Sequence, residues 1–190
     1  MIPSGGWFIQ SDFEEIIVPS IWEQETFLAK TGPELSKQMW TFKDKGDRDV
    51  CLIPEVTGIF QETWREKCSK SQKYRKVAYC QRAYRYERPQ AGRYREFTQF
   101  GIEILGNYPN GDQEVQDLLK AGLDAIGVNY EFDSTATRGL GYYTELGFEA
   151  RCESLGAQKQ VAGGGRYAVG IGWAIGVDRL VLAKMGISNG

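Results

Sequence analysis

The residues with the clearest chemical potential lie on two neighbouring stretches, 77–88 (VAYCQRAYRYER) and 95–105 (REFTQFGIEIL). Their aromatic and β-branched residues predict two strands, and the Pro/Gly-containing segment between them predicts a hairpin with a longer loop. Alternate residues of a strand face the same side. We therefore expect five polar or aromatic side chains to point toward one region, namely Arg85, Glu87, Phe97, Gln99 and Glu103.

These side-chain types suit a nucleotide and an amine. The guanidinium of Arg85 can form two parallel hydrogen bonds to phosphate oxygens, and the ring of Phe97 can stack on a nucleobase. The carboxylates and the amide can accept hydrogen bonds from amino groups. The loop adds Arg88, Arg93 and Arg95 next to a glycine, which suits a polyphosphate or an RNA end. A solvated cationic turn with surface ion pairs is the alternative that charge alone leaves open.

The elements that must position these residues are strands in sequence, with helices between and after them. Strand-like segments are 12–19, 48–54, 129–133, 141–150 and 158–162, and helical segments are 58–69, 112–126 and 174–184. In 112–126 the apolar residues fall on one helical stripe, and Gly127 is a natural stop. The glycine run 163–165, taken alone, is more typical of a flexible turn. The order predicts a mostly antiparallel α+β fold, a sheet flanked by helices.

Composition narrows the possibilities further. The 190 residues have the length of one domain, placed at 1–190. There is no histidine, and the four cysteines are scattered without a CxxC pair, so no metal site built from histidine or cysteine is expected. A net charge of −2 argues against general nucleic-acid binding, so any RNA contact must be local. No apolar run reaches the roughly 18 residues of a membrane helix. We expect a cytoplasmic protein that has no signal peptide and does not bind membranes.

The segment 85–106, RYERPQAGRYREFTQFGIEILG, resembles motif 2 of the class II aminoacyl-tRNA synthetases, in particular its histidyl-tRNA synthetase version. The Arg-x-Glu pair, the loop and the Phe-x-Gln pair match in order and spacing. The resemblance implies that Arg85 holds the α-phosphate of ATP and that Glu87 binds the adenine amino group. Arg93 would reach the γ-phosphate, and Phe97 would stack on adenine.

The same resemblance implies an amino-acid pocket assembled from several segments. Its residues would be Glu55, Thr57, Gln99, Glu103, Tyr142, Tyr143 and Gly164. The first two, in a segment that resembles the stretch before motif 2, would bind the α-amino group, and Tyr143 would contact the substrate side chain. The segment DSTATRGLGYYTELGFEA resembles a histidyl-specific stretch, in which Arg138 would stabilise charge at the carboxylate and the α-phosphate. GIGWAIGVDRL resembles motif 3, with Arg179 on the γ-phosphate.

The sequence also departs from the family pattern. Ile53 and Val56 stand where the family has arginine and glycine, and Gly141 stands where it has aspartate. EEIIVP resembles only the end of motif 1, the dimer element, and one short helix replaces an insertion that follows motif 2. VAGGGRY resembles the family's glycine-rich strand beside the amino acid, but the loop after it is short, and no anticodon-binding domain is recognised. The resemblance therefore covers a shortened catalytic core.

The activity implied is that of an AMP-forming ligase of the histidine–tRNA type. The carboxylate of an amino acid, histidine in the first instance, would attack the α-phosphate of ATP, with Mg²⁺ bridging the phosphates and Arg85, Arg138 and Arg179 as catalytic residues. Transfer to the acceptor end of tRNA and a homodimer are further expectations. Two alternatives remain open: a regulatory or sensing paralog that charges no tRNA, and a ligase for a carrier or protein acceptor. An excised or engineered core of a larger synthetase also fits.

Overall fold

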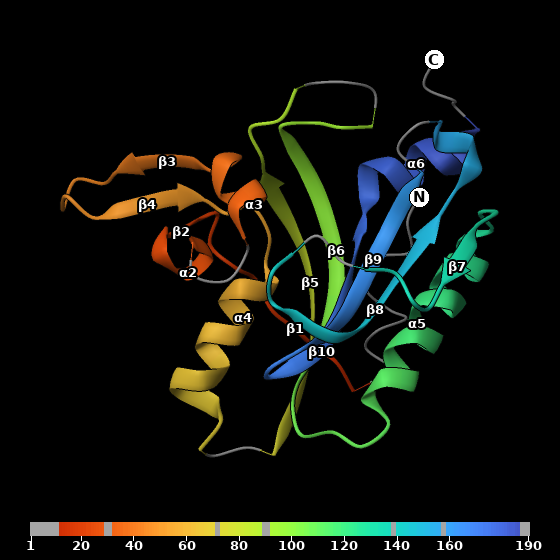
Figure 1. The fold of residues 1–190 in the computed structure, drawn as a ribbon, viewed down its shortest axis with the longest axis horizontal. Coiled ribbons are helices and arrows are strands. Elements are labelled where there is room, and N and C mark those ends of the chain that lie inside the picture. Colours follow the sequence, from red (N-terminus) through yellow and green to blue (C-terminus); the bar gives the residue numbers. More distant parts are fainter. Residues whose placement is uncertain are drawn as a thin grey trace.

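The computed structural model describes residues 12–28, 32–70, 73–88, 92–137, 140–156 and 159–186. Its centre is a seven-stranded sheet (Figure 1). In spatial order the strands are β1 (Glu14–Glu15), β5 (Tyr74–Tyr84), β6 (Glu96–Gly106), β10 (Gly170–Gly176), β9 (Gln160–Tyr167), β8 (Tyr143–Arg151) and β7 (Glu131–Asp133). β1 runs parallel to β5, and every other neighbouring pair is antiparallel. The predicted mostly antiparallel α+β fold is confirmed.

The hairpin of β5 and β6 is present as predicted, but its first strand is shorter at the loop end. Each strand has eleven residues, and they pair without a register shift as far as Tyr84. The N–H of Arg85 still donates to the carbonyl of Arg95 (2.9 Å), whereas the N–H of Tyr86 donates to the carbonyl of Gln38 (2.6 Å). The predicted end at residue 88 was therefore wrong, because the chain leaves the ladder after Arg85 to pair with a different segment.

One face of the sheet is covered by α5 (Gly111–Ile126) and α6 (Val177–Met185), as Figure 1 shows. The buried stripe of α5 consists of Val115, Leu119 and Leu123, which pack with Ile102 and Ile104 of β6. Gly127 ends α5 at φ 70°, a left-handed conformation that glycine adopts without strain. The predicted helix 112–126 and the apolar face of β6 are both confirmed.

The opposite face is covered by α4 (Thr57–Thr63), which continues into the π-helical turn η1 (Trp64–Cys68). Ile59, Phe60 and Trp64 are buried there, as their helical spacing predicted, in a second core with Val77 and Leu105. The short helices α2 (Glu25–Leu28) and α3 (Pro33–Lys37) lie at the same side of the molecule (Figure 1). The sheet is thus a layer between two helical layers.

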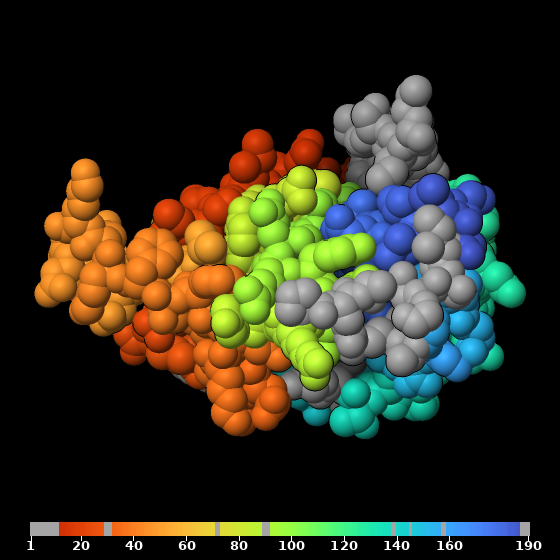
Figure 2. All heavy atoms as spheres, turned by 90° about the horizontal axis from the view of Figure 1, so that it is seen from above, coloured from red at the N-terminus to blue at the C-terminus, as the bar shows by residue number. Residues whose placement is uncertain are grey.

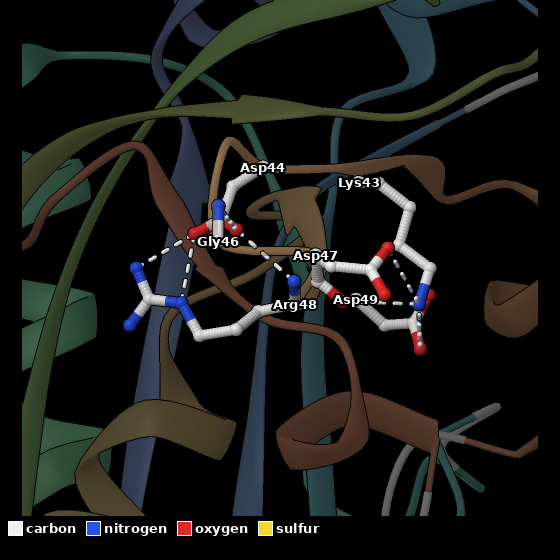
Figure 3. A network of polar contacts seen from close by, with 6 residues as sticks. All are labelled: Lys43, Asp44, Gly46, Asp47, Arg48 and Asp49. Atoms are coloured by element: carbon white, nitrogen blue, oxygen red, sulfur yellow. Dashed lines mark hydrogen bonds and ion pairs between the residues drawn. The ribbon is translucent and has the colours of Figure 1, made fainter.

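A second, three-stranded sheet has the order β2 (Ile21–Glu23), β4 (Asp49–Leu52) and β3 (Trp40–Lys43). Residues 40–52 form an arm that projects from the body, seen at the left of Figures 1 and 2. All four residues of β3 are exposed. At the tip, Asp44 accepts hydrogen bonds from the N–H groups of Gly46 (2.8 Å) and Arg48 (3.0 Å), and Lys43 bonds the Asp49 carboxylate (3.1 Å; Figure 3). Side chains of the turn itself therefore hold the arm in shape.

The C-terminal part bears on two further predictions. The glycine run 163–165 lies inside β9, a buried strand, as its resemblance to the family's glycine-rich strand implied and unlike the turn that the glycines alone favour. The last helix begins at Val177 rather than near Ala174, because residues 170–176 pair with both β6 and β9 as β10.

The predicted strand 12–19 contracts to two residues, while 48–54 is confirmed as β4. Within the part of the chain that the structure describes, no helix is long and apolar enough to cross a membrane. The short 3-10 turn η2 (Glu153–Leu155) links β8 to β9.

Candidate active site

A cleft of about 410 Å³ opens on the α4 side of the large sheet, at the N-terminal end of α4. Gln99 of β6, Gly163 of β9 and Ala174 of β10 form part of its floor. Its walls come from α3, from the segment before α4, from the loop of the β5–β6 hairpin and from the start of α6. The cleft therefore gathers side chains from most of the chain's length, including the two predicted strands.

One end of the cleft is lined by arginines and an aromatic ring. Arg85, Glu87, Arg93, Phe97 and Arg179 all line it. The Nε of Arg85 donates to the carbonyl of Pro54 (2.9 Å), which fixes the side chain, and its guanidinium carbon lies 5.2 Å from the centroid of the Phe97 ring. Glu87 and Arg93 form an ion pair. Three arginines against two carboxylates, Glu87 and Asp178, make this end suitable for a polyanion next to a planar ring.

Arg179 reaches the cleft from the first turn of α6. The carboxylate of the neighbouring Asp178 accepts a hydrogen bond from the N–H of Thr98 on β6 (2.7 Å), which ties the start of the helix to the floor. Burial lowers the pKa of Arg179, the positive charge of Arg93 lowers it further, and Glu87 opposes both effects. The guanidinium groups of Arg93 and Arg179 therefore repel each other in the cleft, and an anion placed between them would relieve that repulsion.

The other end of the cleft is carboxylic and aromatic. Glu55 is only 3% exposed and accepts hydrogen bonds from the N–H of Gly58 (2.8 Å) and the hydroxyl of Tyr142 (3.2 Å). Thr57 and Tyr143 line the same end. The Tyr142 and Tyr143 rings lie 4.7 Å apart. A buried carboxylate beside hydroxyl groups has the chemistry to bind a cationic or amine group.

Glu103 lies beneath this end rather than in its lining. The side chain is 1% exposed, and its two oxygens accept hydrogen bonds from the hydroxyls of Thr57 (2.5 Å) and Tyr167 (2.7 Å). Burial raises the pKa of Glu103 to about 8, the hydrogen bonds from the two hydroxyls act against this rise, and the nearby Glu55 carboxyl adds to it. Burial also raises the pKa of Glu55, against the hydrogen bond from Gly58 and the charge of Arg85.

The cleft thus brings together most of the predicted site residues. Those that line it are Arg85, Glu87, Arg93, Phe97, Arg179, Glu55, Thr57, Gln99, Tyr142 and Tyr143. Glu103 is not part of the lining, but it accepts a hydrogen bond from Thr57, which is. Gly164 faces the opposite side of the sheet: a β-carbon built on it would lie 2.6 Å from the Phe148 ring. Its neighbour Gly163 lines the cleft instead. Arg138 lies outside the described residues.

Several residues that line the cleft, and one that supports it, were missed from the sequence. Tyr79 lines the cleft, and it shares the strand face of Arg85 by simple alternation, so parity would have found it. Glu149 and Gln160 line the cleft from β8 and β9, whose register no sequence pattern fixed. Tyr167, which holds Glu103, is two residues from Gly165 and shares its face.

The departures from the family pattern have a structural setting. Ile53 and Val56 are fully buried in the core beneath α4, with Phe27 and Met39. An apolar side chain fits these two positions, because a charged one would be desolvated there. Gly141 is exposed just before Tyr142. The departures at Ile53 and Val56 therefore affect the buried residues next to Glu55 and Thr57, and none of the departures falls on a side chain that lines the arginine end.

Comparisons with known proteins identify the family of this chain. The model of the histidyl-tRNA synthetase family matches residues 6–131. A histidine–tRNA ligase of Methanococcus aeolicus is 40% identical over 125 residues, which are 65% of this chain and 30% of that protein. The chain thus matches about a third of the length of this curated relative.

Solved structures share the fold over nearly the whole chain. Apo histidyl-tRNA synthetase of S. aureus superimposes with a TM-score of 0.74 at 25% identity, covering 94% of this chain and 62% of that one. A Bacillus halodurans C protein described as an ATP phosphoribosyltransferase regulatory subunit/histidyl-tRNA synthetase gives 0.76 at 16% identity, covering 93% and 75%. With the family model matched over most of the sequence, the chain belongs to the histidyl-tRNA synthetase family and carries a class II synthetase fold.

Proposed function

We propose that this chain activates histidine with ATP, forming histidyl-adenylate and pyrophosphate. The observation that carries the proposal is the two-ended cleft: an arginine-rich end with Phe97 is continuous with a carboxylic end built around Glu55. ATP and an amino acid have the matching chemistry, since one is a polyanion with a base and the other carries an amine. The whole of 1–190 is proposed as one catalytic domain.

At the arginine end, Arg85 would bind the α-phosphate, and Arg93 and Arg179 would bind the γ-phosphate. Phe97 would stack on adenine while Glu87 accepts from its amino group. In the ligand-free cleft Glu87 is ion-paired with Arg93. Binding of ATP would therefore replace this ion pair with contacts from each partner to the nucleotide.

At the carboxylic end, Glu55 and Thr57 would bind the α-amino group of histidine. Gln99 is well placed for the ligand, because its Oε1 is buried without a hydrogen-bond partner among the described residues. Such an atom is costly unless a donor reaches it. Tyr142 and Tyr143 would pack on the imidazole, and Glu103 would act on the pocket through Thr57.

The reaction follows from this arrangement. A carboxylate oxygen of histidine attacks the α-phosphorus, the bond to the bridging oxygen breaks, and pyrophosphate leaves with the electron pair. Arg85 would neutralise charge at the α-phosphate, as Arg138 is expected to do, so positioning and charge carry the catalysis. Mg²⁺ would neutralise the phosphates. Mg²⁺ in such sites is held mainly by phosphate oxygens, with one or two protein carboxylates.

Transfer of the histidyl group to the acceptor end of tRNA, a homodimer and a cytoplasmic location are the remaining parts of the proposal. They follow from family membership, and the matched relative is longer than this chain. The proposal thus separates into activation, which the cleft geometry supports, and transfer, which rests on the family.

The test is amino-acid-dependent exchange of pyrophosphate into ATP, measured with each of the twenty amino acids. We expect exchange with histidine, and its loss in Arg85→Ala and Arg179→Ala. Arg82→Ala is the matched control, because Arg82 lies on the same hairpin in an exposed ion pair with Glu96. Normal exchange in Arg85→Ala would show that Arg85 has been wrongly assigned.

A regulatory or sensing subunit is the second candidate. Gly141 in place of the family's aspartate favours it, because this residue borders the tyrosines of the carboxylic end. Binding of histidine or ATP by calorimetry, with no exchange for any amino acid, would support this second function over the first.

A further inference from the structure

The two ends of the arm return to the body at one place, where three backbone carbonyls form what we call the arm base. They belong to Gln38, just before the arm, and to Ile53 and Pro54, just after it. The N–H of Tyr84 donates to the carbonyl of Ile53 (2.9 Å), and the N–H of Tyr86 donates to that of Gln38 (2.6 Å). The end of β5 and the residues that follow it are therefore bonded to both ends of the arm, which lies beside the hairpin in Figure 2.

Arg85 and Glu87, two residues assigned to ATP, lie in this bonded stretch. The Nε of Arg85 donates to the third carbonyl of the arm base, that of Pro54 (2.9 Å), and its N–H donates to the carbonyl of Arg95 (2.9 Å). The Nε of Arg95 donates in turn to the carbonyl of Glu87 (3.1 Å). The chain is thus held by the arm base and by the start of the second hairpin strand together, and the places of Arg85 and Glu87 follow from these bonds.

Two aromatic rings close this junction from outside. Trp40, the first residue of the arm, is 37% exposed, and Tyr86 is 53% exposed. Their rings meet edge to face, with centroids 4.9 Å apart. The guanidinium carbon of Arg95 lies 4.3 Å from the centre of the Tyr86 ring and 6.0 Å from that of Trp40. Aromatic pairs and cation–π contacts stabilise by more than the buried area alone, so Trp40 and Arg95 hold Tyr86, the residue between Arg85 and Glu87, against the arm.

The rings of Trp40 and Tyr86 have no part in the cleft lining or in the two hydrophobic cores of the described residues. Loss of either ring should therefore leave the fold intact. The histidine end should also be unaffected, because Glu55 is held by the N–H of Gly58 and Thr57 by Glu103. The change would fall on the ATP end, where a displacement of about 1 Å in a charged group is enough to weaken binding and catalysis.

We infer that Trp40 and Tyr86 are positioning residues for ATP. They hold the arm base against residues 84–87 and thereby set where Arg85 and Glu87 stand in the cleft. The inference rests on the proposed function and deepens it, because it gives the projecting arm a part in nucleotide binding although neither ring touches the nucleotide.

The test is the pyrophosphate exchange assay, with the KM measured separately for ATP and for histidine. We expect Trp40→Ala and Tyr86→Ala each to raise the KM for ATP by about five- to tenfold, as the loss of one aromatic pair implies, with little change in the KM for histidine. Trp40→Phe should keep most of the wild-type KM, because it preserves an aromatic contact. The double variant should be no worse than the more affected single variant, since both changes remove one shared contact.

Phe42→Ala is the matched control. This aromatic residue is 42% exposed, lies on the same strand as Trp40 and shares its face by alternation. It stands two residues closer to the arm tip, so its loss should leave the KM for ATP unchanged.

A second measurement needs neither ATP nor activity. The backbone N–H of Tyr86, which donates to Gln38, should exchange with deuterium faster in Trp40→Ala than in the wild type, as followed by NMR. Unchanged exchange of this N–H, or an unchanged KM for ATP in Trp40→Ala, would overturn the inference. So would equal increases of the KM for ATP and for histidine, or an equal effect of Phe42→Ala. A wild-type protein without pyrophosphate exchange would count against the proposed activation, and ATP affinity by calorimetry together with the Tyr86 N–H would then decide the inference.

Discussion

Replacing Glu103 with glutamine should make the protein's stability less sensitive to high pH. The carboxyl is buried, and its pKa of about 8 lies above its ordinary value of 4.5. Because the folded state holds this proton more tightly than the unfolded state, stability is fully present below pH 4.5 and falls as pH rises toward 8. Each pH unit between the two pKa values corresponds to about 1.4 kcal/mol, so ionisation of Glu103 would cost the folded state about 5 kcal/mol at most.

Glutamine has the shape of the protonated acid and also carries one acceptor and one donor. It can accept from the hydroxyl of Thr57 and donate to that of Tyr167, or the reverse, as each hydroxyl can do either. Glu103→Gln should therefore match the wild type near pH 5, within about 1 kcal/mol. Above pH 8 it should be more stable than the wild type by several kcal/mol, since it has nothing to ionise.

The assay is urea unfolding of both proteins at pH 5, 7 and 9. Glu55 titrates in both, so most of its contribution cancels in the difference between them. Glu96→Gln, an exposed site on the same strand, should show no such pH-dependent gain. An equal stability difference between Glu103→Gln and the wild type at pH 5 and pH 9 would refute the reasoning, because it would mean that Glu103 is ionised in the folded protein throughout.

Three further predictions concern ATP binding and packing. Phe97→Ala should raise the KM for ATP in the exchange assay by about tenfold or more, with a smaller effect on the KM for histidine, because it removes the stacking ring; equal changes in both constants would argue against stacking. Leu119→Ala should lower the free energy of unfolding in urea by about 2–5 kcal/mol, since Leu119 is fully buried under the sheet. Gly172→Ala should lower the thermal unfolding midpoint by several degrees, because the added β-carbon would collide with the Glu103 carboxylate and the Ile102 carbonyl. An unchanged midpoint would mean that β6 and β10 can move apart without a cost in stability.

Strand alternation predicted much of the site from the sequence. Phe97 and Gln99 line the cleft, while Ile102 and Ile104 pack under α5, as the period of two requires. Alternation does not say how far along a strand a helix covers the face. Glu103 shares the face of Gln99, yet it lies under Thr57 at the start of α4 and is closed off from the cleft. Depth along the strand depends on tertiary packing, which the sequence pattern does not encode.

The glycine run shows a second limit. Three consecutive glycines carry no hydrophobic alternation, so nothing in the sequence tells which of them faces the cleft. The structure settles this through pairing: Gly163 stands opposite Ala174 of β10, and both line the cleft, whereas Gly164 faces Phe148. The early departure of the chain after Arg85 was equally hidden, because its cause is a backbone hydrogen bond to the distant Gln38.

The glycines of the sheet also bear on how this protein could be altered. A methyl group added at Gly101 would meet the Tyr79 hydroxyl at 2.5 Å, and one added at Gly165 would meet the Tyr143 ring at 2.7 Å. The space that these two glycines leave is therefore filled by the side chains of Tyr79 and Tyr143, both of which line the cleft. A side chain added at either position would push a tyrosine of the cleft, so the two glycines fix the shape of the lining although neither of them belongs to it.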